Sequence, residues 1–179
     1  MGKRQIVGLK WAKRLAAKPA GIPQGRARGQ KAFGVRYEKA LSRALGRYAQ
    51  HGVWFEYEDL NGPGVCQVDM MIPGSNGVWA VLEAKYTWTL RGHLELEQLY
   101  CPVVSAALGP CKGIVVCRNL LPEAIAVPVF GNLISAVECT RPRVILHWHE
   151  GTPVWGDARA SAPLNTGKPS AASLAAEGL

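Results

Sequence analysis

Two acidic side chains and a lysine, contributed by two short neighbouring segments, are the residues of this sequence best suited to chemistry. Asp69 lies in the segment VCQVDMMIP, and Glu83 and Lys85 follow in GVWAVLEAKYT. Two carboxylates held close together resist joint ionisation unless a cation compensates their charge. Mg²⁺ suits such a pair, because it prefers oxygen ligands, keeps several waters and takes substrate phosphate in its remaining positions. The trio therefore predicts metal-assisted chemistry on a phosphate.

A β-hairpin is the element that would bring the three side chains together. Residues 65–72 and 77–86 are apolar and strand-like, and the sequence PGSNG between them is a strong turn signal. With the turn centred on Ser75, Asp69 lies diagonally across from Glu83, with Cα atoms about 7–8 Å apart. Lys85 shares the face of Glu83, since side chains alternate along a strand. A register slip of one residue would place the two acids on opposite faces.

The chemistry of such a site follows from its residue types. A divalent ion held by Asp69 and Glu83 lowers the pKa of a bound water and stabilises charge on the scissile phosphate. Lys85 would position the attacking water as catalytic base or stabilise the transition state. No Cys or His joins the cluster, which argues against zinc. The alternative is that Glu83 and Lys85 form an ordinary solvent-exposed ion pair.

The segment before the hairpin has the periodicity of an amphipathic helix from Phe33, with Gly52 as the stop after His51. Its apolar residues recur at helical spacing: Tyr37, Ala40, Leu41, Ala44, Leu45 and Tyr48. Its basic residues form a separate stripe: Arg36, Lys39, Arg43 and Arg47. Glu38 flanks the apolar face, so this acid is expected to point toward the body of the domain.

The remaining pattern completes an α/β fold. A strand is expected over residues 53–58, before the two of the hairpin, and a helix over 90–108 that Pro102 should kink or split. Residues 112–118 form an apolar run typical of a strand buried on both faces, and 143–149 form a last strand. This order predicts a mixed sheet flanked by helices.

Charge is distributed unevenly along the chain. Residues 1–47 hold thirteen Lys and Arg and one acid, a charge of +12, whereas residues 48–179 hold eight basic and twelve acidic residues, a charge of −4. A basic N-terminal third on a mildly acidic body indicates a polyanionic partner, most often nucleic acid. A solubilising or targeting arm is the alternative.

Composition sets the domain boundaries. Residues 1–33 are expected to form a basic flexible arm, 34–150 the folded α/β domain and 151–179 a disordered tail. No run of 18 apolar residues occurs, so no membrane span is expected. The five cysteines contain no CxxC pair and lie mostly in apolar segments, which favours reduced thiols and a cytoplasmic or nucleoid-associated protein.

At these residues the sequence resembles the PD-(D/E)XK nuclease superfamily. Asp69 matches the first motif position, Glu83-Ala84-Lys85 matches the (Asp/Glu)-x-Lys that follows, and Glu38 matches an acid on the preceding helix. The resemblance covers residues 34–118 and implies a restriction-endonuclease-like αβββαβ core that binds Mg²⁺ or Mn²⁺ and cleaves DNA phosphodiesters. It also implies that the backbone carbonyl of Ala84 is a metal ligand, beside Asp69, Glu83 and Glu38.

Two departures from the family pattern concern neighbouring positions. Gln98 matches a glutamine that some members carry on the next helix, but Pro102 stands where those members have a tyrosine. Val68 stands where the usual proline precedes the aspartate. Gln98 is therefore a candidate catalytic residue without its customary neighbour.

The expected function is a small metal-dependent DNA endonuclease. Without a separate specificity domain, structure-selective or weakly sequence-specific cutting is favoured, as in the dimeric Holliday-junction resolvases that the family includes. The stripe Arg36, Lys39, Arg43 and Arg47, together with Arg91, would contact the phosphate backbone. Two alternatives remain: a non-catalytic DNA- or RNA-binding module that uses the basic arm, and a structural RNA-associated protein.

Overall fold

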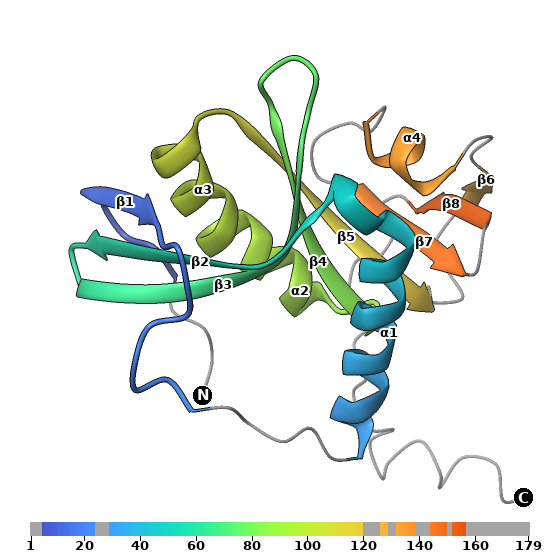
Figure 1. Ribbon diagram of the computed structural model, residues 1–179, viewed down its shortest axis with the longest axis horizontal. Helices are drawn as coiled ribbons and strands as arrows, with labels where there is room; N and C mark the ends of the chain where they lie inside the picture. The colour runs from blue at the N-terminus through green and yellow to red at the C-terminus, as the bar shows by residue number, and fades with distance from the viewer. Residues whose placement is uncertain are drawn as a thin grey trace, which may run out of the picture.

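An eight-stranded mixed sheet organises the described part of the chain (Figure 1), in the order β1-β2-β3-β4-β5-β7-β8-β6. The computed structural model describes residues 5–23, 29–119, 126–128, 132–138, 144–149 and 152–156 of the 179. The strands are β1 (Trp11–Arg14), β2 (Gln50–Asp59), β3 (Gly62–Pro73), β4 (Trp79–Thr87), β5 (Cys111–Asn119), β6 (Ala126–Pro128), β7 (Val144–His149) and β8 (Thr152–Gly156). The helices are α1 (Gln30–Leu45), α2 (Leu90–Glu95), α3 (Cys101–Leu108) and α4 (Leu133–Glu138), with a 3-10 turn η1 (Gly46–Tyr48) and a π-helical segment η2 (Leu96–Tyr100).

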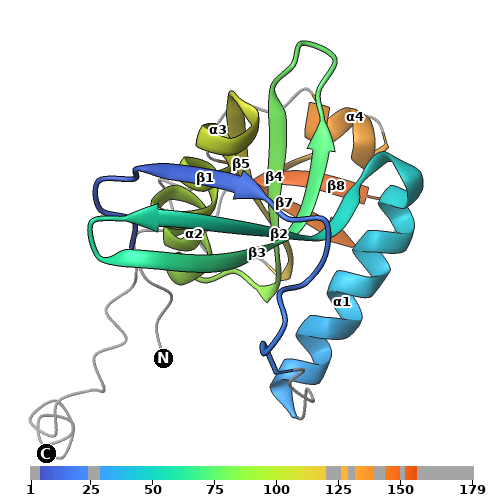
Figure 2. The same ribbon diagram turned by 60° about the vertical axis from the view of Figure 1, so that its left-hand side comes forward.

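The strand pairing changes from antiparallel to parallel at β4. Strands β1 to β4 pair antiparallel, β5 and β7 continue parallel to β4, and β8 and β6 are antiparallel again. The segments α2, η2 and α3 form the crossover between β4 and β5 and lie on one side of the sheet, while α1 lies on the other (Figures 1 and 2). The predicted mixed sheet flanked by helices is confirmed, as is the order helix, three strands, helix, strand.

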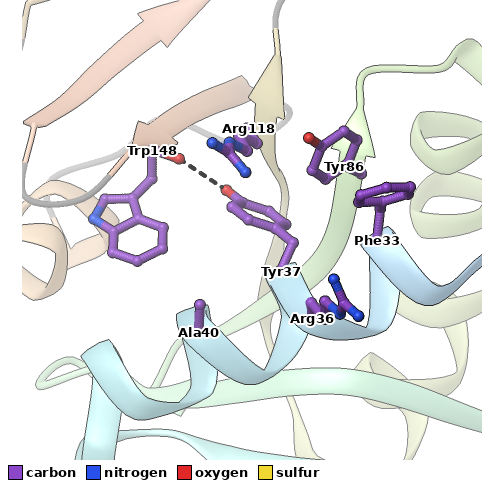
Figure 3. Close-up of a pocket in the computed structure, with 7 residues that line it drawn as sticks. All are labelled: Phe33, Arg36, Tyr37, Ala40, Tyr86, Arg118 and Trp148. Atoms are coloured by element: carbon purple, nitrogen blue, oxygen red, sulfur yellow. Dashed lines mark hydrogen bonds between the residues drawn. The ribbon is translucent and has the colours of Figure 1, made fainter. Parts of the chain in front are cut away.

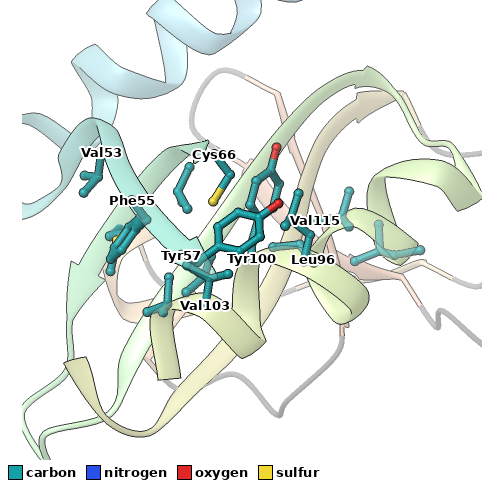
Figure 4. Packing of buried hydrophobic residues seen from close by; sticks show 14 of the residues in the cluster. Val53, Phe55, Tyr57, Cys66, Leu96, Tyr100, Val103 and Val115 are labelled. Carbon is teal, nitrogen blue, oxygen red and sulfur yellow. The ribbon is translucent and has the colours of Figure 1, made fainter. Parts of the chain in front are cut away.

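Two hydrophobic cores occupy the two faces of the sheet. The first packs the crossover helices onto the sheet (Figure 4): Val53, Phe55, Tyr57, Cys66, Val68, Met71, Val81, Trp88, Leu96, Leu99, Tyr100, Val103, Val104, Val115, Cys117 and Ile145. The second packs α1 and α4: Tyr37, Leu41, Leu45, Ala49, Met70, Ile72, Ala80, Leu82, Ile114, Val116, Leu133, Ala136, Val137, Leu146 and Trp148. Strand β5 contributes to both, as its predicted burial on both faces requires.

Strand β3 changes faces in its middle. Cys66 and Val68 pack in the first core, whereas Met70 and Ile72, which have the same parity, pack in the second. The change falls at Asp69, opposite Gly52 of β2, whose φ of 58° lies in the left-handed region. A regular strand alternates strictly, so β3 is locally distorted at the position of its aspartate.

Helix α1 is shorter than predicted. It ends at Leu45, and Gly46 caps it with a φ of 53°, so the predicted stop at Gly52 is wrong. Leu41 and Leu45 are fully buried, but Tyr48, predicted on the apolar face, is 56% exposed in η1. The apolar periodicity of the sequence extends to Tyr48, whereas the helix ends at Leu45 before Gly46.

The helical segment after β4 is divided, as Pro102 predicted. Helix α2 passes into η2, and α3 begins at Cys101 with Pro102 in its first turn. Leu96, Tyr100 and Cys101 keep right-handed helical dihedrals, so the helix runs on into Pro102 and the π-helical segment η2 accommodates the missing proline N–H. No described helix has the length and apolar character needed to cross a membrane.

The N-terminal segment differs from its prediction as a flexible arm. Residues 11–14 form β1, which pairs with β2 from Trp11↔Glu58 to Arg14↔Phe55. Upstream, the amide of Ile6 donates to the carbonyl of Gln98 at 3.0 Å, and Val7 donates to Asp59 at 3.1 Å. The prediction is wrong for these residues, because backbone pairing rather than apolar periodicity holds them.

The C-terminal prediction is also wrong where the structure describes it. Strand β8 pairs with β7 from Ile145↔Gly156 to His149↔Thr152, so the sheet extends beyond residue 150. Residues 157–179 of the predicted tail lie outside the described residues.

Candidate active site

The two strand carboxylates lie across from each other where β3 and β4 separate. The ladder between these strands runs from Pro73↔Trp79 to Met70↔Leu82, and its register places Asp69 opposite Glu83. Asp69 Oδ2 accepts the backbone N–H of Ala84 at 2.9 Å, so a side chain takes the part of a backbone carbonyl at the end of the ladder. Directly opposed residues have Cβ atoms about 4.5–5.5 Å apart. Asp69 and Glu83 thus occupy opposed register positions just past the last pair of the ladder, whereas the prediction placed them diagonally.

The predicted register was wrong by two residues. A turn centred on Ser75 pairs Asp69 with Val81, whereas the observed turn is centred one residue later and pairs Met71 with Val81. Asn76 supports this longer turn, because its Oδ1 accepts the amide of Val78 at 3.2 Å. In a regular strand a shift of two residues preserves the face on which each side chain lies, so the register error alone does not separate the two acids.

Lys85 is the cation of this cluster. Its ammonium forms an ion pair with Glu83 and lies 3.6 Å from Glu95 Oε2. The Glu83 side chain is 2% exposed and that of Glu95 is 9% exposed, while Lys85 is 27% exposed. The ammonium therefore reaches from partly solvated surroundings toward two buried carboxylates.

The charge state of Lys85 follows from these neighbours. Burial disfavours the charged ammonium, but Glu83, Glu95 and Asp69 outweigh it and raise the pKa of Lys85 above its ordinary value. The side chain is therefore a cation at neutral pH. In this arrangement it can stabilise negative charge, and it holds no lone pair with which to accept a proton.

Glu95 is a member of the cluster that the sequence analysis missed. It lies on α2, whose first turn is capped by the Thr89 hydroxyl accepting the amide of Gly92 at 3.3 Å. Gly92 allows the helix to approach Lys85, because a Cβ at that position would lie 2.7 Å from Lys85 Cε. The only signal in the sequence was the i, i+4 pair with Arg91, a spacing typical of exposed helix surfaces.

Gln98, the predicted candidate on this helix, is not brought to the trio. It lies in η2, and its backbone carbonyl accepts the amide of Ile6. Among the described residues, its side chain makes no hydrogen bond to Asp69, Glu83 or Lys85. Glu95, three residues earlier, occupies the place on this helix that faces the lysine.

Glu38 lies within electrostatic reach of Glu83 from helix α1. Burial and then the negative charge of Glu83 raise the pKa of Glu38, while Lys39 and Lys85 oppose the shift. The predicted inward placement of this acid is thus supported. The carboxylates of α1 and β4 contribute to one region of negative potential.

Replacing Glu38 with Gln is expected to raise the melting temperature at pH 7 and to leave it unchanged near pH 4. A group whose pKa is raised by folding favours the folded state at low pH, and this contribution is lost as the pH rises through the folded-state pKa. Glu56→Gln, at an exposed acid paired with Lys13, is the control. Equal shifts at the two pH values would show that folding does not raise the pKa of Glu38.

The carboxylate and carbonyl oxygens of this cluster are the kind of ligand that a hard divalent ion prefers. Among the described residues, no three or more His, Cys, Asp or Glu side chains converge as a metal site. Mg²⁺ usually requires only one or two carboxylates, with waters and substrate phosphate as its other ligands. That requirement is met by the carboxylates of Asp69 and Glu83, which occupy opposed positions. The carbonyl of Ala84, the residue after Glu83, adds a further oxygen.

The predicted DNA-contacting residues lie on the surface. Four basic side chains of α1 and η1 that were predicted to contact DNA are exposed: Arg36, Lys39, Arg43 and Arg47. Arg36 lies over the ring of Phe33 at 5.9 Å, and Arg47 lies over Tyr48 at 5.8 Å. Arg91 is held differently, because its Nε donates to Glu95 Oε1 at 3.0 Å. The stripe on α1 therefore offers more accessible charge than Arg91.

Comparison with known proteins yields no relative: no protein-family model matches the chain, and neither the curated proteins nor the solved structures include a significant match.

Proposed function

We propose that the protein is a metal-dependent DNA endonuclease of the PD-(D/E)XK type. The observation that carries the proposal is the meeting of Asp69 and Glu83 at the open end of the β3–β4 ladder, with Lys85 beside Glu83. The acids come from neighbouring strands and a crossover helix supplies Glu95, so three elements fix the cluster. The order α1, β2, β3, β4, α2–α3, β5 supports the comparison with a restriction-endonuclease-like core.

Each residue has a defined task in this reaction. Asp69, Glu83 and the Ala84 carbonyl would hold Mg²⁺ or Mn²⁺, with Glu38 close enough to add a water-mediated contact. The ion, when bound, supplies an activated water and stabilises charge on the phosphate. Lys85, protonated by the influence of its acidic neighbours, stabilises the negative charge that develops on the scissile phosphate. Glu95 positions the ammonium and touches no reacting atom.

The substrate would be bound through its phosphates. The exposed basic stripe on α1 continues from the flank of Glu38 and offers sequence-independent contacts to a nucleic-acid backbone. Structure-selective cleavage, at a DNA junction or branch, is consistent with the described residues, which include no separate sequence-recognition domain. The DNA partner, a homodimeric assembly and a cytoplasmic or nucleoid-associated location remain predictions.

One observation favours a second candidate, a non-catalytic DNA- or RNA-binding module. Lys85 already pairs with Glu83 and Glu95, and Arg91 pairs with Glu95, so these carboxylates have cationic partners from the chain itself. In that case the carboxylates would stabilise the fold around β4 and α2, and the basic surface alone would bind nucleic acid.

The decisive experiment compares Asp69→Asn with Asp59→Asn in a cleavage assay on four-way-junction and linear DNA, with Mg²⁺ or with EDTA. Both aspartates accept a backbone N–H with their side chains, Asp69 from Ala84 and Asp59 from Val7 and Asn61. Asp59 lies at the far end of β2 and is fully buried, so its substitution controls for lost stability. We expect Mg²⁺-dependent cleavage that Asp69→Asn abolishes and Asp59→Asn retains.

Two outcomes would contradict the proposal. Cleavage by Asp69→Asn at the wild-type rate would remove the site from the reaction. DNA binding without cleavage under every metal condition, with the affinity unchanged in Asp69→Asn, would support the binding module instead.

A further inference from the structure

A cavity of about 300 Å³ lies on the α1 side of the sheet (Figure 3). Its volume is at the lower end of the range for small-ligand pockets, roughly 300–1,000 Å³. The lining residues come from α1, from the ends of β4 and β5, and from β7: Phe33, Arg36, Tyr37, Ala40, Tyr86, Arg118 and Trp148. The cavity accommodates a group of the size of one nucleotide and excludes a base-paired segment.

The lining has two chemical parts. Four of the seven residues are aromatic and two are arginines, and none is acidic. Each arginine rests on a ring: Arg36 lies 5.9 Å from the centroid of Phe33, and Arg118 lies 5.4 Å from that of Tyr86. A guanidinium stacked on a ring is already oriented, so it loses less freedom when it binds a phosphate. The cavity therefore favours a ligand that is both planar and anionic.

The aromatic residues have different parts in this arrangement. Tyr37 is 6% exposed, and its hydroxyl donates to the backbone carbonyl of Trp148 at 3.2 Å, which fixes the floor of the cavity. Phe33, by contrast, is 50% exposed and packs at 5.6 Å against Tyr86. Figure 3 shows these two rings side by side at the same end of the cavity. They offer an accessible apolar surface on which a planar ring can stack.

The cavity adjoins the proposed catalytic cluster through the chain itself. Tyr37 directly precedes Glu38 on α1, and Tyr86 directly follows Lys85 on β4. Neighbouring residues have Cα atoms about 3.8 Å apart, and successive side chains of a strand point to opposite faces. The cavity and the Lys85 ammonium therefore lie on opposite faces of β4, and a nucleic-acid strand that occupies both must pass around the end of that strand.

We propose that this cavity binds one unpaired nucleotide, with its base against Phe33 and Tyr86 and its phosphate between Arg36 and Arg118. The choice of a nucleotide over other aromatic anions rests on the proposed function. Stacking on aromatic rings is worth about 1–3 kcal/mol per base and tolerates any base sequence. The site thus favours nucleic acid that presents an unpaired nucleotide.

The test is a calorimetric titration in EDTA, which excludes metal-dependent cleavage from the measurement. The probes are deoxyadenosine monophosphate, adenosine monophosphate, deoxyadenosine and inorganic phosphate. We expect the monophosphates to bind more tightly than the nucleoside or phosphate alone, and the two sugars to report whether DNA or RNA is preferred. Equal affinity for phosphate and nucleotide would overturn the proposal, since it would show a general anion site.

Substitutions separate the two parts of the cavity. Arg118→Gln should weaken monophosphate binding about tenfold, the effect expected of one hydrogen bond to a charged group. Phe33→Ala should weaken monophosphate binding about fivefold through lost stacking. Because the Phe33 ring is 50% exposed, this variant should still fold. Lys112→Gln is the matched control, because Lys112 lies on the same strand as Arg118 but near the opposite end. The proposal would be overturned if Arg118→Gln, Phe33→Ala and Lys112→Gln all bound the monophosphates with the same affinity.

The two proposals fail separately. Glu83→Gln should bind the monophosphates with wild-type affinity, since Glu83 is absent from the cavity lining. Nucleotide binding without any cleavage of DNA would leave the cavity assignment intact and contradict the endonuclease. Cleavage without nucleotide binding would do the reverse.

Discussion

Replacing Glu83 with Gln should lower the rate of DNA cleavage at least about a thousandfold, while DNA affinity in EDTA stays within about threefold of wild type. The substitution keeps the volume of a side chain that is 2% exposed, but it removes one of two strand carboxylates. A metal ion supplies several kcal/mol of transition-state stabilisation, and about 1.4 kcal/mol corresponds to a factor of ten in rate. The loss should appear in single-turnover cleavage rates at saturating Mg²⁺.

Glu95→Gln is the matched comparison for this variant. Both glutamates are buried and both lie against Lys85, but only Glu83 is a proposed metal ligand. Glu95→Gln should therefore retain Mg²⁺-dependent cleavage at a reduced rate, because it only loosens the position of the ammonium. Equal losses in the two variants would indicate that the carboxylates serve the ion-pair network alone.

Replacing Lys85 with Met should lower the free energy of unfolding by about 3 kcal/mol, near the lower end of the range for removing one partner of a buried ion pair. The apolar stem of the lysine is replaced, but Glu83 and Glu95 lose their shared cation. Urea denaturation at pH 7 measures the loss. Lys112→Met is the control, because the ammonium of Lys112 donates to a backbone carbonyl, that of Glu138, at 2.8 Å.

The same variant tests the metal site independently of catalysis. If Asp69 and Glu83 bind Mg²⁺, millimolar Mg²⁺ should restore much of the stability of Lys85→Met, since an ion that binds only the folded state stabilises it by mass action. The wild type should gain less, because its ammonium competes for Glu83. A variant whose stability does not respond to Mg²⁺ would contradict the assignment of the metal ligands.

The wild-type ion pair should persist through the alkaline range. The pKa of Lys85 is raised by folding above its ordinary value of 10.5, so its contribution to stability is complete below that pH. It is lost only as the pH rises through the folded-state pKa. The stability difference between wild type and Lys85→Met should therefore be constant from pH 7 to about pH 10.

Local pattern was sufficient to predict the elements that carry the candidate site. Apolar periodicity identified the buried face of α1 through Leu41 and Leu45, and the turn residues of the β3–β4 hairpin identified the element that joins Asp69 to Glu83. The register was not determined locally, because either Ser75 or Asn76 can stand at the centre of a turn in PGSNG. The error was an even number of residues, which in a regular strand leaves the face of each side chain unchanged.

The features that could not be predicted depend on long-range packing. Glu95 is buried because Gly92 lets α2 approach the stem of Lys85, a contact between a helix and a strand. Strand β1 has no apolar alternation of its own, because three of its four residues are exposed and its pairing with β2 supplies its order. The cavity has residues from four elements, and sequence spacing alone relates only those on α1.

The change of face within β3 has a consequence for how substitutions combine. In a regular strand, residues two apart are neighbours on one surface, so their substitutions affect each other. Here Val68 and Met70 belong to separate cores, while Val68 and Met71, three apart, share one. Energetic coupling along β3 should therefore follow a spacing of three across Asp69 and of two on either side of it. Because Val68 and Met70 flank Asp69 but pack in different cores, a substitution at one of them should leave the packing of the other undisturbed.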